Sequence, residues 1–95
     1  MPKTARQEYN ALLVRSRRVA LAIVEREVQA KLPKGWKLWL AVGWGLTLYD
    51  ADGKAVVGMH ETADHLPRGV RHACLLAADF CDTFGYGNEK IEGCA

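Results

Sequence analysis

The sequence predicts a single α+β domain in which a long helix, an antiparallel β-meander and a second helix follow one another (αβββα). Residues 4–32 contain no Gly or Pro and space their apolar side chains at helical intervals. Residues 36–59 alternate apolar and polar side chains, which is typical of strands. Residues 66–84 return to helical spacing, and residues 85–95 form a tail. A chain of 95 residues has room for one hydrophobic core.

Residues 4–32 form the first predicted helix. Thr4 is its expected N-cap, with Gln7 at the capping-box position, and Pro33 to Gly35 end it. A helical wheel places its main apolar face, which we expect to cover the sheet, on Tyr9, Leu12, Leu13, Ser16, Ala20, Ile23 and Val24. A second row at the edge, with members seven residues apart, comprises Val14, Leu21 and Val28. The apolar surface is therefore broad enough for a sheet and a further partner.

Residues 36–59 predict two or three antiparallel strands. The side chains expected to face the helices in the first two strands are Trp36, Leu38, Leu40, Val42, Trp44, Leu46 and Leu48. Those expected on the opposite face are Lys37, Trp39, Ala41, Gly45, Thr47 and Tyr49. Gly43 and Gly45 indicate a turn or a bulge between the runs, and residues 50–54 carry a strong hairpin signal.

The second helix is predicted over residues 66–84. Thr62 or Asp64 is available as a cap, Pro67 suits the first turn, and Gly85 or Gly87 ends the helix. Its apolar face comprises Leu66, Val70, Ala73, Cys74, Ala77, Phe80, Cys81 and Phe84. The tail is either a short edge strand or loosely ordered.

Composition bounds the class of protein. Hydrophobic residues make up 49% of the chain and charged residues 25%, which is ordinary for a globular domain. The net charge of +2 does not by itself indicate a nucleic-acid partner. Three cysteines without a CxxC pair predict reduced thiols. With no signal peptide and no apolar run long enough to span a membrane, we expect a cytoplasmic protein.

The sequence does not predict catalysis. A Cys/His site can be drawn from His60, His65, His72 and Cys74, but Cys74 belongs to the apolar face of the second helix. The histidine spacing matches no zinc motif, and neither GWG nor FGYG matches a phosphate-binding loop. We therefore expect no enzyme activity, no metal and no cofactor.

Two groups of side chains are the predicted contacts for a partner protein. Arg15, Arg17 and Arg18 have no acidic residue three or four positions away, so no helical ion pair neutralises them. A solvated helix face and a binding patch both fit this pattern. Trp39 and Tyr49 lie on the sheet face that helices on one side would leave open.

The segment LPRGVRHACLL, which opens the last helix, resembles the corresponding segment of the double-stranded-RNA-binding fold and of small HicA-type RNA-cleaving toxins. The resemblance spans residues 36–80 and implies phosphate contacts by Lys34, Arg68 and Arg71, with Trp39 or Tyr49 as stacking surfaces. That family carries its catalytic histidine in the sheet. The strands WKLWLAV and WGLTLYD contain none, so the resemblance implies binding without cleavage.

A compact α/β chain with broad apolar helix faces and no catalytic set is also similar to phage and mobile-element inhibitors of the anti-CRISPR type. That resemblance is one of class and assigns no residues. It implies a non-enzymatic protein-interaction module that inhibits a bacterial effector complex, a host nucleoprotein. A homodimer is a further expectation, and an RNA- or DNA-binding module is the alternative function.

Overall fold

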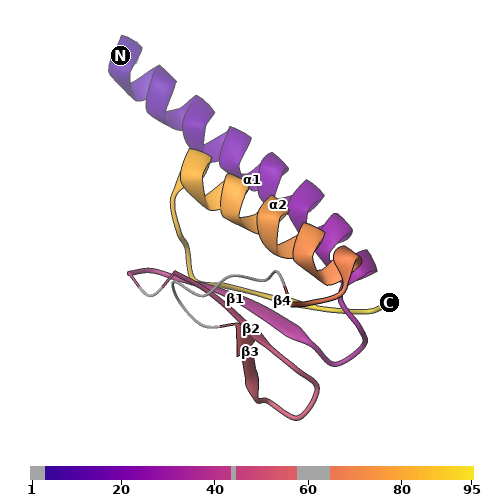
Figure 1. Ribbon diagram of the computed structural model, residues 1–95. Helices are drawn as coiled ribbons and strands as arrows, with labels where there is room; N and C mark the ends of the chain where they lie inside the picture. Colours follow the sequence, from indigo (N-terminus) through magenta and orange to yellow (C-terminus); the bar gives the residue numbers. More distant parts are fainter. Residues whose placement is uncertain (1–3, 44, 58–64) are drawn as a thin grey trace.

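The computed structural model describes residues 4–43, 45–57 and 65–95, excepting the side chains of Leu13 and Val57 (Figure 1). Its elements are α1 (Ala5–Lys31), β1 (Lys37–Ala41), β2 (Gly45–Tyr49), β3 (Ala55–Val57), α2 (Arg68–Phe84) and β4 (Glu89–Glu92). The predicted α+β class and order of elements are confirmed. The tail forms an edge strand, which was one of the two alternatives.

The four strands form one antiparallel sheet in the order β3-β2-β1-β4, and both helices lie on the same face of it (Figure 1). β1 is central: Leu38 is opposite Leu48 of β2 on one side and Ile91 of β4 on the other. These three side chains are fully or almost fully buried, at 1% exposure or less. The edge strand thus forms because Ile91 completes the apolar face beneath the helices.

The two helices contribute unequally to the core. α2 buries one continuous face, formed by Val70, Ala73, Cys74, Ala77, Phe80 and Cys81. Among its described side chains, α1 buries only Val24 and Val28, with Ala20 and Leu21 packed at the margin. These buried side chains lie in the C-terminal half of α1.

The predicted apolar face of α1 is wrong in most of its members. Tyr9 and Leu12 are each 61% exposed, Ile23 is 58% exposed, and Ser16 is exposed as well. The row that was expected at the edge supplies Val28, which is 0% exposed, and the half-buried Leu21. The reason is the position of α2, which packs on a face of α1 rotated away from the Tyr9–Ile23 row.

α1 also extends well past the rest of the molecule (Figure 1). Arg17 Nη2 donates to the carbonyl oxygen of Gly85, the C-cap of α2, at 3.5 Å, so α2 ends at the level of Arg17. The radius of gyration is 15.0 Å, whereas a compact chain of this length would have about 12 Å. The extension explains the long dimension of 52 Å.

The ends of the helices follow local rules. Thr4 caps α1 with a full capping box: Gln7 N donates to Thr4 Oγ1, and Thr4 N donates to Gln7 Oε1. Gly85 ends α2 with φ +81°. Pro67 precedes α2 as its N-cap rather than lying in the first turn. The cap candidates Thr62 and Asp64 lie outside the described residues.

The hairpins agree with the predicted turns, with one correction. The Asp50 carboxylate accepts hydrogen bonds from the amides of Asp52 and Lys54, each at 2.9 Å. Val42, which was expected on the inner face of the sheet, lies in the turn after β1 and is 65% exposed. The strand has ended there, so its alternation no longer applies.

Candidate interaction surfaces

The N-cap Thr4 and residues 5–16 of α1, which together we call the projecting segment, lie beyond the end of α2 (Figure 1). Every side chain described in this segment is exposed, including Tyr9, Leu12 and Val14. The segment is about 20 Å long. The segment continues a helix whose second half is packed, so it needs no nucleation of its own, but it frays more readily than the packed half because its described side chains are exposed.

One face of α1 carries an exposed apolar row that continues from the projecting segment into the packed half. We call Tyr9, Leu12, Val19 and Ile23 the outer stripe; their exposed fractions are 61%, 61%, 57% and 58%. With Ser16 included, the spacing is alternately three and four residues, which is the seam of a coiled coil. The stripe lies on a different side of α1 from Val24 and Val28. Sequence reasoning missed Val19, although this spacing was the signal.

The opposite side of the projecting segment holds a shallow hollow of about 540 Å³. We call it the arginine hollow; its described lining is Asn10, Ala11, Val14, Arg15 and Arg18. Val14 is 63% exposed and is an apolar part of this lining. Arg15 and Arg18 are exposed and make no salt bridge to any described residue. The structure thus brings two of the three predicted arginines together.

Arg17, the third predicted arginine, has an internal role. Its Nη1 lies 2.9 Å from Glu89 Oε1 of β4, and its guanidinium carbon lies 5.1 Å from the centre of the Phe80 ring. Both charged side chains are mostly shielded, at 26% and 20% exposure. Arg17 therefore ties α1 to β4 and α2 and is not available to a partner. Local sequence reasoning could not pair it because Glu89 is 72 residues away.

The open face of the sheet carries the predicted aromatic pair. Its outward side chains are Lys37, Trp39, Thr47, Tyr49, Lys90 and Glu92. Trp39 lies between Thr47 and Lys90 in the register and is half-buried among its neighbours. Trp36, by contrast, packs against the core, as predicted. Trp44 lies outside the described residues.

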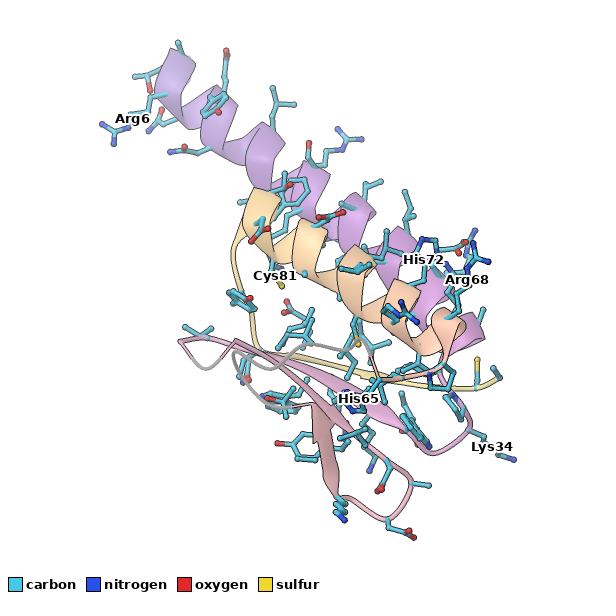
Figure 2. All side chains as sticks on the ribbon, viewed as in Figure 1. Arg6, Lys34, His65, Arg68, His72 and Cys81 are labelled. Carbon is cyan, nitrogen blue, oxygen red and sulfur yellow. The ribbon has the colours of Figure 1, made fainter. Side chains whose placement is uncertain are left out.

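Of the predicted phosphate contacts, Arg68 lies on the opposite face of the sheet from these rings (Figure 1). Lys34 and Arg68 are exposed at the end of the molecule where α1 stops and α2 starts (Figure 2). α2 and Trp39 lie on opposite faces of the sheet, so the sheet separates Arg68 from that ring. Arg71 is half-buried, and its Nε has no hydrogen-bond partner among the described residues.

The thiols and imidazoles form no reactive cluster among the described residues. Burial raises the pKa of the Cys74 thiol to about 11. The pKa of Cys81 is also raised to about 11, first by burial and then by the charge of Glu89, against the opposing charge of Arg17. At neutral pH about one thiol in ten thousand is then ionised. The described residues contain no group of three potential metal ligands; His60 lies outside them.

Comparison of the chain with protein-family models, curated proteins and solved structures found no match. Within the described ranges, no helix has the length and apolar character needed to cross a membrane. The surfaces above are therefore the basis for any statement about function.

Proposed function

We propose that this protein is a small, non-enzymatic protein-interaction module that docks through the projecting segment of α1. The supporting observation is that this segment exposes all of its described side chains, apolar ones included, and lies beyond the level of Arg17, where α2 ends. Helices with such faces are commonly stabilised by a partner.

The arginine hollow suits an acidic partner surface. Arginine beside apolar surface is a common interface anchor, because its long stem packs while its guanidinium bonds carboxylates in two places. Arg15 and Arg18 are free of salt bridges to described residues, so docking breaks no described ion pair. Their placement beside Val14 combines charge and apolar contact in one patch.

The class resemblance to inhibitors of the anti-CRISPR type suggests the kind of partner. In this proposal the chain acts in the bacterial cytoplasm by occupying a site on a nucleoprotein effector complex. The partner's contact surface would be acidic, to match Arg15 and Arg18 of the arginine hollow. Occupation of that site, without chemistry, would be the inhibitory act.

The test is affinity capture from bacterial lysate, followed by identification of the retained proteins. The wild-type chain is compared with the variant R15E/R18E and with the control K54E, which changes an exposed residue in the hairpin before β3. We expect one retained complex that R15E/R18E loses and K54E keeps. Equal retention by R15E/R18E, or no specific retention by the wild type, would contradict the proposal.

A second candidate function is single-stranded nucleic-acid binding on the open sheet face. The specific observation is that Trp39 adjoins Lys90 across the strand pair, with Lys37 and Tyr49 in the next row. Aromatic rings between lysines form a stacking platform. Anisotropy of a labelled single strand at low salt should show binding that W39A weakens and added salt abolishes. Unchanged binding by W39A would remove this platform.

A further inference from the structure

We propose that the outer stripe is the seam of an antiparallel homodimer, in which α1 of one copy lies along α1 of a second copy. This inference rests on the proposed interaction function. It names a second copy of the chain as one partner and the outer stripe as the face that binds it. The residues involved differ from Arg15 and Arg18 of the arginine hollow, so the two ideas can fail separately.

The spacing of the stripe is the first argument. Tyr9, Leu12, Ser16, Val19 and Ile23 continue the three-four alternation over about four turns of α1. Ala5 precedes them and Ala30 follows them at the same spacing, with Arg26 as the interruption. A partner that matches this seam is another straight helix with the same repeat, and a second copy supplies one.

The order of side chains along the seam selects the antiparallel direction. When two copies are aligned about the point between Arg17 and Arg18, Leu12 meets Ile23 of the second copy and Ser16 meets Val19. Tyr9 then meets Arg26 of the second copy, a pairing of a cation with an aromatic ring that accounts for the one charged residue in the seam.

The flanking charges are complementary in the same register. Arg6, near the N-terminus of α1, flanks Glu27 near the C-terminus of α1 of the second copy, and the two-fold axis repeats this pair. Arg6 is exposed (Figure 2). Glu27 has a side chain that is 51% exposed and makes one contact of 3.6 Å to Lys31. In a parallel alignment of the two helices, no basic residue would lie opposite Glu8 or Glu27, the two acidic residues that flank the seam.

The dimer also accounts for the projecting segment. In the antiparallel register, residues 5–16 of one copy lie against residues 19–30 of the other, which the body of that copy holds in place. The weakly held half of each α1 is thus supported by the firmly held half of its partner.

Molar mass in solution, measured by sedimentation over a range of concentrations, tests the seam. We expect the wild type to reach twice the chain mass of 10.5 kDa. L12E should raise the dissociation constant by roughly 100-fold or more, because it places two carboxylates in an apolar seam. V14E is the matched control: Val14 is 63% exposed on the other side of the same segment, and the variant should dimerise as the wild type does.

Charge reversal tests the register. R6E and E27R should each weaken dimerisation, by roughly threefold to tenfold, since each creates two like-charged pairs. An equimolar mixture of R6E and E27R should form a heterodimer at about wild-type strength, because both of its pairs are then complementary.

A wild-type mass of 10.5 kDa at every concentration would overturn the homodimer, as would equal dissociation of L12E and V14E. No recovery in the mixture would overturn the antiparallel register. If the wild type is monomeric and the L12E variant no longer retains a bacterial protein that the wild type captures, the stripe binds that protein and not a second copy. Loss of capture in R15E/R18E with an intact dimer would leave both proposals standing.

Discussion

Val28 and Ile23 lie five positions apart on α1 and have opposite environments. Val28 is 0% exposed beneath α2 and the sheet, whereas Ile23 is 58% exposed on the outer stripe. Helical periodicity alone assigns them the other way, with Ile23 on the main buried face and Val28 at its edge. The loss of stability when each is truncated to alanine therefore tests which of the two is buried: Ile23, as the helical wheel predicts, or Val28, as in the structure.

The magnitudes follow from burial. V28A removes two buried methyl groups, worth about 1.6 kcal/mol of transfer free energy, and leaves a cavity, for a total of roughly 2–3 kcal/mol. For a domain of this size that corresponds to a fall in Tm of roughly 10–20 °C. I23A removes exposed carbon, and alanine is the better helix former, so its intrinsic cost should stay within about 0.5 kcal/mol.

The assay is urea unfolding followed by circular dichroism at two protein concentrations. The loss in V28A should be present at both, because it belongs to the folded chain itself. Any loss in I23A should shrink on dilution, because it would belong to the association of two copies. A loss of 2 kcal/mol or more in I23A that persists at the lower concentration would refute the assignment of Ile23 to the surface.

Three further predictions test the described contacts. A double-mutant cycle of R17M and E89Q should give a coupling of about 1 kcal/mol in unfolding free energy, and a coupling near zero would mean the ion pair is not formed in solution. Iodoacetamide at pH 8 should modify Cys94 in the native protein and should modify the buried Cys74 and Cys81 only after urea is added. Mass spectrometry of the peptides measures the labelling of each thiol. Equal labelling of all three in the native protein would contradict the burial. W39A should change unfolding free energy by less than L38A, whose side chain is 0% exposed, and a larger loss in W39A would assign the ring to a packing role.

The parts of the fold that could be predicted are those with one clear pattern. α2 carries a single apolar face between polar residues, so its buried residues followed from spacing. The capping box at Thr4 and the hairpin at Asp50 are local, because their hydrogen bonds join residues two to four apart. β4 was left open because its only apolar side chain, Ile91, gives no alternation to read.

α1 could not be resolved in the same way because it has two apolar rows. A wheel shows where the rows are, but only the placement of α2 decides which one is buried. The row of Val24 and Val28 is buried, and the row of Leu12 and Ile23 is exposed. The prediction of a broad apolar surface on α1 was correct, but the prediction of which of its two rows stays exposed was wrong.

The candidate contact residues divide in a similar way. Arg15 and Arg18, which were predicted as contacts because they have no acidic residue nearby in the helix, are exposed. Trp39 lies on the sheet face away from the core. Arg17 had the same local pattern as its neighbours, but its partner comes from a strand near the other end of the chain. Contacts between distant segments have no local sequence signal, so they need the fold.

Amide hydrogen exchange along α1, followed at low and high protein concentration, tests the central claim most directly. If the projecting segment is a docking element that a second copy supports, residues 5–16 should exchange rapidly in dilute solution and become protected as concentration rises. Residues 24–31, which pack against α2 and the sheet, should be protected throughout. Equal and concentration-independent protection along the whole of α1 would contradict the account.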